Sequence, residues 1–255
     1  MLRYEVDAPR ATLTIDDPER RNPMSNEVMD AMVDAVTDAA ANPDVRVIVV
    51  TGAGDRAFSA GGDLSGGFVD TPVAQHDERG ALARLLRLLR TCGRPTVARV
   101  NGHALGGGFG VAAACDVTVA VDTSLLGTPE VRVGLWPSMI SAVLRDVMPA
   151  KAALEMMLTG RRIDAHEAQR LGIVSRVVPA DELDDAVDEV VASLASFSPA
   201  VLRMGRDSWY AAADMDHDSA LELLHAGLTS AAMTEDAVEG VAAFLQKRDP
   251  EWRGR

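Results

Sequence analysis

Two glycine-rich stretches and one glutamate are the residues of this 255-residue chain whose types and spacing could do chemistry. In the segment Ala57–Leu64, small residues leave backbone N–H groups open to a ligand. In Gly106–Gly108, three glycines precede an apolar segment that could form a helix. The unpaired N–H groups in the first turn of such a helix lie at the positive end of its dipole. Two such amides on one carbonyl oxygen would form an oxyanion hole, worth about 3 kcal/mol per donor in acyl chemistry.

The residues alone leave this interpretation open, because glycine-rich loops also serve as tight turns or points of close packing. The carboxyl group of Glu130, which follows Pro129, could move a proton next to such a hole or could simply lie at the surface.

Other reactive motifs are missing or out of context. The chain has no Gly-Lys pair for a Walker A loop, and His166-Glu167 has no second histidine at Arg170 for a zinc protease helix. The five histidines are scattered, so no metal site is expected. Gly108–Ala113 fits a dinucleotide fingerprint with Glu130 about 20 residues on. The preceding strand, Thr96–Val100, ends too early for the direct strand-to-helix turn that this fingerprint requires.

The elements that must position these residues alternate between strands and helices, which predicts an α/β protein. The segment 57–67 is predicted as a loop, without regular structure. β-branched or alternating patterns predict strands over Tyr4–Asp7, Leu13–Ile15, Val45–Val50, Thr96–Val100, Val117–Val121 and Ile173–Val178. Apolar residues at helical spacing predict helices after Ser25, over Leu82–Leu89, Lys151–Leu158, Ala165–Leu171 and 183–194, and over 200–213, 218–231 and 234–246.

After residue 198 the predicted elements are helices alone. The chain is therefore expected to have two parts, an α/β core over 1–198 and a helical region over 199–255. The helical region carries more apolar residues than a detached three-helix piece needs, so part of it should pack on a neighbouring subunit.

Composition excludes several classes of function. The 25 basic and 38 acidic side chains give a net charge of −13, which repels a nucleic-acid backbone. No apolar run reaches the roughly 18 residues that a membrane span needs. The acidic residues Glu5 and Asp7 argue against a signal peptide. Cys92 and Cys115 are expected to be reduced thiols of the core, in a protein located in the cytoplasm.

Several motifs in register carry a resemblance to a known family over nearly the whole chain. The motifs are Ala57–Leu64, Arg94–Gly108, Ala114–Asp116, Pro129–Leu135, Ala153–Gly160 with its sequel from Ala168 to Pro179, and Ala243–Arg248. In their residues and their order, they resemble the crotonase (enoyl-CoA hydratase/isomerase) superfamily.

The resemblance implies a spiral of ββα repeats with a helical C-terminal region, assembled as a homotrimer or a homohexamer. It implies an acyl-CoA substrate, with coenzyme A as part of the substrate and no separate cofactor. The backbone N–H groups of Ala60 and Gly107 would be the oxyanion-hole donors, with Glu130 as the acid/base. Substrate-binding positions carried over by the resemblance are Arg21, Pro23, Ala57, Ser59, Gly61, Gly62, Asp63, Leu64, His103, Leu105, Gly106, Pro129 and Gly134. His103 is expected to be a neutral residue that lines the pocket or supports it.

The negative chain must then hold the phosphates of coenzyme A locally. Backbone amides would bind the adenine and the pantetheine arm. A few cations such as Arg21, Arg56, Lys247 or Arg248 would meet the phosphates near the mouth of the site.

Two departures from the family pattern bear on the reaction. Hydratases of this family carry a second glutamate three residues beyond the second oxyanion glycine, where this chain has Gly110. A glycine there is expected to widen the pocket near the reacting carbons. The segment Trp136–Ile140 also lacks the usual glycine-rich continuation, which leaves the acyl chain length open.

The leading prediction is an enoyl-CoA hydratase, a lyase of fatty acid metabolism. A single-glutamate Δ3,Δ2-enoyl-CoA isomerase is the alternative. Thioester hydrolysis, decarboxylation and a CoA-binding protein with little activity remain further alternatives.

Overall fold

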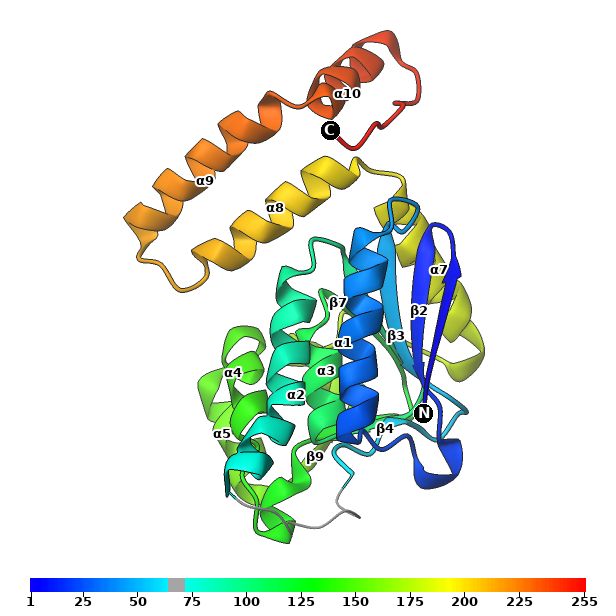
Figure 1. The fold of residues 1–255 in the computed structure, drawn as a ribbon, viewed down its shortest axis with the longest axis vertical. Helices are drawn as coiled ribbons and strands as arrows, with labels where there is room; N and C mark the ends of the chain where they lie inside the picture. The colour runs from blue at the N-terminus through cyan, green and yellow to red at the C-terminus, as the bar shows by residue number, and fades with distance from the viewer. Residues whose placement is uncertain (64–71) are drawn as a thin grey trace.

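The computed structural model describes residues 1–63 and 72–255, whose strands form two sheets (Figure 1). The larger sheet consists, in spatial order, of β1 (Leu2–Asp7), β2 (Arg10–Ile15), β3 (Val47–Gly52), β5 (Thr96–Val100), β7 (Val117–Val121) and β10 (Arg176–Val178). The smaller sheet consists of β4 (Ala57–Ser59), β6 (His103–Leu105), β8 (Leu125–Gly127) and β9 (Arg162–Asp164). Only the pairs β1–β2 and β8–β9 are antiparallel.

From β3 to β8, consecutive strands alternate between the two sheets, and a helix follows each pair. The chain runs from β3 to β4 to α2 (Pro72–Thr91), then from β5 to β6 to α3 (Gly107–Ala114). It continues from β7 to β8 and on to α4 (Ser138–Val147), after a 3₁₀ helix, η2 (Pro129–Val133). Each unit adds one parallel strand to each sheet. This arrangement is the predicted spiral of ββα repeats.

The larger sheet is covered on both faces, as the apolar run of β3 predicts. Ile48 and Val50 lie in the core cluster with side chains of α1 (Asn26–Ala41) and α2. Val47 and Val49 point the other way and pack with side chains of α7 (Leu183–Ala195). Successive side chains of a strand face opposite sides of the sheet, so the six residues of β3 pack against the helices on both faces. Helix α1 begins where predicted, with the Ser25 hydroxyl capping the Val28 N–H.

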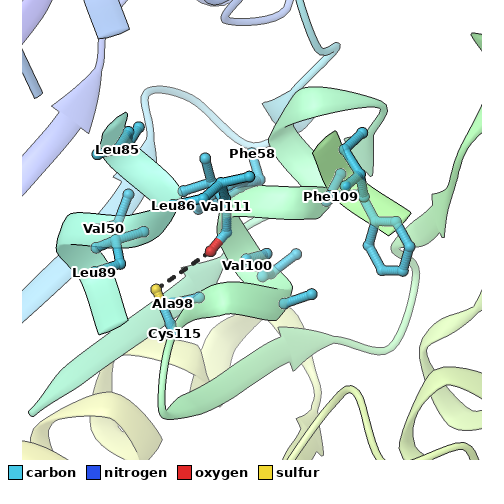
Figure 2. Close-up of a cluster of buried hydrophobic side chains, with 14 of the residues drawn as sticks. Val50, Phe58, Leu85, Leu86, Leu89, Ala98, Val100, Phe109, Val111 and Cys115 are labelled. Carbon is cyan, nitrogen blue, oxygen red and sulfur yellow. Dashed lines mark hydrogen bonds between the residues drawn. The ribbon is translucent and has the colours of Figure 1, made fainter. Parts of the chain in front are cut away.

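Helix α3 is buried along nearly its whole length, which fixes the position of its first turn. Figure 2 shows the cluster around it, in which side chains of β3, β4, α2 and β5 meet α3. The Cys115 thiol donates a hydrogen bond to the Val111 carbonyl at 3.5 Å. Both cysteines are free and neither is exposed, with Cys115 fully within the core.

The short strands of the smaller sheet are the main correction to the predicted elements. The segment predicted as a loop over 57–67 begins with strand β4, and β6, β8 and β9 were also missed. Each of these strands has three residues, which is too short for alternation of side chains to show in the sequence. These segments form strands because they pair with each other, and this pairing cannot be read from any one segment of the sequence.

The C-terminal part is helical from residue 199 on. It contains α8 (Pro199–Ala212), α9 (His217–Ala232) and α10 (Glu235–Gln246), after α5 (Ala150–Thr159) and α6 (Ala165–Arg170) in the preceding part. Helices α9 and α10 lie away from the sheets, at the opposite end of the molecule from β4 (Figure 1). No helix among the described residues is both long and apolar enough to cross a membrane.

Candidate active site

The first glycine loop continues from β4 and lies beside the segment 21–24. The Met24 N–H donates to the Gly61 carbonyl at 2.8 Å, and the Asp63 N–H donates to the Met24 carbonyl at 3.1 Å. These two bonds make a parallel bridge between Met24 and Gly62. The structure therefore brings the predicted substrate-binding segments 21–23 and 60–63 together.

The bridge corrects the predicted donor in this loop. The Ala60 N–H donates to the Arg21 carbonyl at 2.9 Å, so it is used within the fold. The Gly62 N–H has no protein partner in the described part of the chain. In a parallel bridge the neighbours of Gly62 bond to Met24, so the amide of Gly62 itself faces the other way. The free donor of this loop is Gly62 rather than Ala60.

The second glycine loop meets the first at the start of α3. Gly106 is held by its N–H, which donates to the Gly127 carbonyl at 2.9 Å, and adopts a left-handed φ of 54°. A Cβ placed on Gly61, itself at φ 98°, would lie 3.3 Å from the Gly107 nitrogen and 2.9 Å from the Leu105 carbonyl oxygen. A Cβ on Gly107 would lie 3.7 Å from the Gly62 nitrogen. The amides of Gly62 and Gly107 thus come close together only because the loops lack side chains at these positions.

Glu130 stands against the second loop. It lies in η2, three residues beyond the end of β8, and the bond from Gly106 to Gly127 holds that strand end beside α3. A Cβ on Gly106 would be 3.0 Å from Oε1 of Glu130. The other oxygen, Oε2, is buried and has no hydrogen-bond partner among the described residues. Burial raises the pKa of the Glu130 carboxyl above the ordinary range of a glutamate.

A buried carboxyl oxygen without a hydrogen-bond partner is uncommon in a folded protein and calls for a functional reason. Glu130 has no cationic side chain bound to it in the described structure, and its pKa is moved toward neutral pH. It can therefore both take up and release a proton near the two amides.

Two buried asparagines position the first loop, and the sequence analysis had given neither a role. Asn22, at φ 55°, accepts the Asp17 N–H at 3.0 Å and donates to the Ala57 carbonyl at 2.7 Å. Asn101 donates to the Gly54 carbonyl at 2.6 Å and accepts the Gly52 N–H at 3.2 Å. Asn101 lies inside the segment Arg94–Gly108, and the pair Asn22-Pro23 is a signal of an unusual turn.

The remaining predicted positions divide into supporting and exposed ones. Ala57 and Ser59 are buried, and the Ser59 hydroxyl accepts the Gly61 N–H at 3.1 Å, so both shape the loop from beneath. Gly134 ends η2 with its N–H bonded back to Val131, and a side chain there would meet open space. Pro129 begins η2 beside Glu130. The predicted contact of Leu64 falls outside the described residues.

His103 supports the smaller sheet. Its Nδ1 accepts the Leu125 N–H at 3.1 Å, which ties β6 to β8. Burial, with the nearby cations Arg162 and Arg21, lowers the pKa of His103 below its usual value. The ring is thus held neutral, in agreement with the expected supporting role.

Gly110 does not widen the pocket as predicted. A Cβ at this position would lie 2.9 Å from Cγ1 of Ile140, so the space beside the glycine is already filled. The isoleucine comes from α4, and its contact with α3 could not be read from spacing along the chain.

Among the described residues, no group of three or more His, Cys, Asp or Glu side chains could hold a metal ion. What the site offers is two backbone amides, one unpaired carboxyl and a spiral of ββα repeats that holds them, which together define a crotonase-type protein.

Comparisons with known proteins indicate the same class of protein. The model of the enoyl-CoA hydratase/isomerase family matches residues 7–255. A Thermus thermophilus protein provisionally named an enoyl-CoA hydratase is 36% identical over 247 residues, covering 95% of this chain and 96% of its own. The carnitinyl-CoA dehydratase of Salmonella paratyphi A is 33% identical over 260 residues, covering 100% of this chain and 98% of its own.

Solved structures give the same answer. An enoyl-CoA hydratase from Mycobacterium smegmatis superposes with a TM-score of 0.94 at 30% identity, covering 98% of each chain. Human enoyl coenzyme A hydratase domain-containing protein 3 also superposes with a TM-score of 0.94, at 31% identity, covering 98% of this chain and 99% of its own. The chain therefore belongs to the enoyl-CoA hydratase/isomerase family, within the crotonase superfamily.

Proposed function

We propose that this protein transforms enoyl-CoA thioesters, with the amides of Gly62 and Gly107 as the oxyanion hole and Glu130 as the acid/base. The observation that carries the proposal is the half-buried carboxyl of Glu130 beside Gly106, whose buried Oε2 has no hydrogen-bond partner among the described residues, next to two glycine amides that approach each other. Fixed amides stabilise a thioester oxygen more strongly once it has become an enolate than while it is neutral.

Hydration of a 2-enoyl-CoA is the first candidate reaction, supported by similarity to proteins named as enoyl-CoA hydratases and as a carnitinyl-CoA dehydratase. The oxygen of water bonds to the β-carbon, the double-bond electrons move toward the thioester oxygen, and the α-carbon gains a proton. With one carboxyl, Glu130 accepts the proton of the attacking water and returns a proton to the α-carbon.

Double-bond migration is the second candidate, favoured by the apolar side chain of Ile140 beside Gly110. Here Glu130 would remove a proton from the α-carbon of a 3-enoyl-CoA, forming the enolate. Returning that proton to the γ-carbon moves the double bond into conjugation, with no net change in mass.

Mass spectrometry of the products separates the two reactions. The purified protein is incubated with 2-enoyl-CoA and, separately, with 3-enoyl-CoA. Gain of one water from the first identifies hydration, and conversion of the second without mass change identifies isomerisation. Glu130→Gln keeps the shape of the side chain but removes its acid, and it should lower turnover by a factor of about 100 or more. Equal turnover by wild type and Glu130→Gln, in both assays, would refute the proposal.

The charged end of coenzyme A requires cations near the first loop. Arg21 and Arg56, which flank the loop, stay in the proposal. Lys247 and Arg248 are not proposed to bind the phosphates of coenzyme A within the same chain, because α10 lies at the opposite end of the molecule from β4 (Figure 1). The Arg248 guanidinium is moreover already bound to the Glu239 carboxylate, at 2.9 Å for one of its two bonds.

We further propose that the protein acts as a homotrimer or a homohexamer in which a second copy covers the apolar surface of the C-terminal helices. Large side chains there are exposed in the single chain, among them Trp209, Leu228, Phe244 and Leu245. A surface of this kind on a negatively charged chain favours association through apolar contacts rather than through opposite charges.

A further inference from the structure

Met24 contacts both of the loops that carry the proposed oxyanion-hole amides. Its backbone forms the bridge to the first loop, because its N–H donates to the Gly61 carbonyl at 2.8 Å and its carbonyl accepts the Asp63 N–H at 3.1 Å. Its side chain reaches the second loop, where a Cβ on Gly107 would lie 3.0 Å from the terminal methyl group of Met24. The same point lies 3.7 Å from the Gly62 nitrogen, so this methyl group lies near both amides.

The position of Met24 is fixed on both sides along the chain. Two residues earlier, the buried side chain of Asn22 donates to the Ala57 carbonyl at 2.7 Å. The next residue, Ser25, is the N-cap of α1, and its hydroxyl accepts the Val28 N–H at 3.3 Å. Met24 itself is 1% exposed and belongs to the main core cluster, where close packing leaves a side chain little freedom. Met24 is therefore a rigid contact for both loops.

We infer that Met24 is a positioning residue that sets the separation of the two oxyanion-hole amides. Its backbone orients the Gly62 N–H, and its thioether side chain fixes the place of Gly107 at the start of α3. The inference rests on the proposed function and names the residue that sets the geometry of its oxyanion hole. Two amides stabilise one oxygen only when both donate to it, and a displacement of about 1 Å can lower a rate by about 100-fold.

Shortening the side chain tests this role, because it leaves the backbone bridge in place. Met24→Ala removes the contact with Gly107, whereas Met24→Leu keeps most of the side-chain volume. Met32→Ala is the matched control, since it makes the same truncation at a fully buried methionine of α1, in the same core cluster. Met24→Val and Met32→Val are a milder pair with the same expectations, for use if an alanine variant does not fold.

Turnover of enoyl-CoA is the first readout. Both alanine variants leave a cavity in the core, so both should lower Tm. Met24→Ala should in addition lose about tenfold or more in kcat relative to Met32→Ala, with KM changed by less than about threefold, because an oxyanion hole acts on the transition state more than on the bound substrate. Met24→Leu should stay within about threefold of wild type. Equal kcat in folded Met24→Ala and Met32→Ala would overturn the inference.

The carbonyl stretch of a bound thioester is the second readout and needs no turnover. Butanoyl-CoA labelled with carbon-13 at the thioester carbonyl is the probe, since it has no double bond to hydrate or to move. Hydrogen bonds from two fixed amides polarise this carbonyl and lower its stretching frequency relative to the free ligand in water. In difference infrared spectra, wild type, Met24→Leu and Met32→Ala should lower the frequency equally, and Met24→Ala should lower it less.

The spectra also separate this inference from the proposed function. An equal lowering in wild type and Met24→Ala would overturn the role of Met24 while leaving the oxyanion hole in place. No lowering in wild type would refute the oxyanion hole itself, and the role of Met24 with it.

Discussion

At the scale of single residues, the proposed site depends on the carboxyl of Glu130, whose Oε2 has no hydrogen-bond partner among the described residues. Glu130 gives up hydration on burial and gains no described hydrogen bond for Oε2 in return. An isolated buried carboxylate is unfavourable, so the neutral form is favoured and the pKa rises. The same environment that raises the pKa also leaves the carboxyl able to exchange a proton with a substrate.

The raised pKa makes a prediction about stability and pH. An unfolded glutamate has a pKa of about 4.3, below that of folded Glu130, so the wild type loses stability as pH rises from there through the folded pKa. Glu130→Gln does not titrate. Its Tm relative to wild type should be constant below pH 4 and should increase through this window. Calorimetry over pH 3.5–8 measures the difference, and a falling difference would indicate a carboxylate with a cationic partner instead.

The donor in the first loop can be tested with a matched pair of variants. Gly62→Pro removes the N–H, whereas Gly62→Ala keeps it and points its Cβ into open space. Because the Gly62 amide makes no bond within the described fold, both variants should fold. The proline variant should lose about 100-fold or more in kcat/KM relative to the alanine variant. Equal kcat/KM in the two folded proteins would remove Gly62 from the oxyanion hole.

The residue types and spacing drew attention to the two loops and Glu130, and the family resemblance then assigned Ala60 as the donor of the first loop, an amide that the fold bonds to the Arg21 carbonyl. Ala60 and Gly62 are two residues apart, and nothing local distinguishes their N–H groups. Pairing with the segment 21–24 decides the matter, because it bonds the amide of Ala60 and turns that of Gly62 away. That segment is about forty residues distant in sequence.

At the scale of elements, α8 is joined to the core by the carboxylate of Asp116, whose side chain is 20% exposed. Asp116, just before β7, accepts hydrogen bonds from the backbone and hydroxyl of Thr96 at 2.7 and 2.9 Å. The same carboxylate accepts Nε of Arg206 and the hydroxyl of Tyr210, both on α8 and both at 2.7 Å. The guanidinium groups of Arg206 and Arg90 each lie 4.9 Å from the centre of the Tyr210 ring. The charges are thus paired and well bonded, as buried charges must be.

Breaking this anchor should destabilise the protein strongly. The Arg206 side chain is 8% exposed, so Arg206→Leu leaves Asp116 largely buried without its cation. The free energy of unfolding should fall by about 3 kcal/mol, and Tm by roughly 5–10 °C. The control is Arg84→Leu, whose ion pair with Asp30 is half exposed on both sides and should contribute less than about 1 kcal/mol. Similar Tm values for the two variants would show that α8 is held by its apolar contacts alone.

The long elements were predictable, and the short ones were not. Six residues of β3 and the apolar stripes of α1 and α7 carry enough periodicity to be recognised from the sequence alone. The strands of the smaller sheet have three residues each, and they form only because they pair with neighbouring strands. Because β4 leads into the first loop and β6 into the second, the unrecognised sheet is the one that brings the loops together.

At the scale of the whole molecule, the exposed apolar side chains of the C-terminal helices predict self-association. The wild type should elute from gel filtration at three or six times its chain mass of 27.0 kDa. Phe244 is 82% and Leu228 70% exposed, so Phe244→Glu with Leu228→Glu does not disturb the core of a single chain. That double variant should shift toward monomer while its circular dichroism stays unchanged. Wild type eluting as a monomer would contradict the proposed assembly.

The sequence by itself indicated the class of this protein through its resemblance to a known family, carried by several motifs in register, and its runs of apolar residues define its long elements. It also predicted a helical region after residue 198, and α8 begins at Pro199. Only the tertiary structure decided which amide of the first loop is free, that Oε2 of Glu130 has no hydrogen-bond partner among the described residues, and that Ile140 fills the space beside Gly110. The physical reason is the same in each case. Hydrogen bonds and packing contacts join segments far apart in the chain, and the availability of a group depends on what those segments leave uncovered.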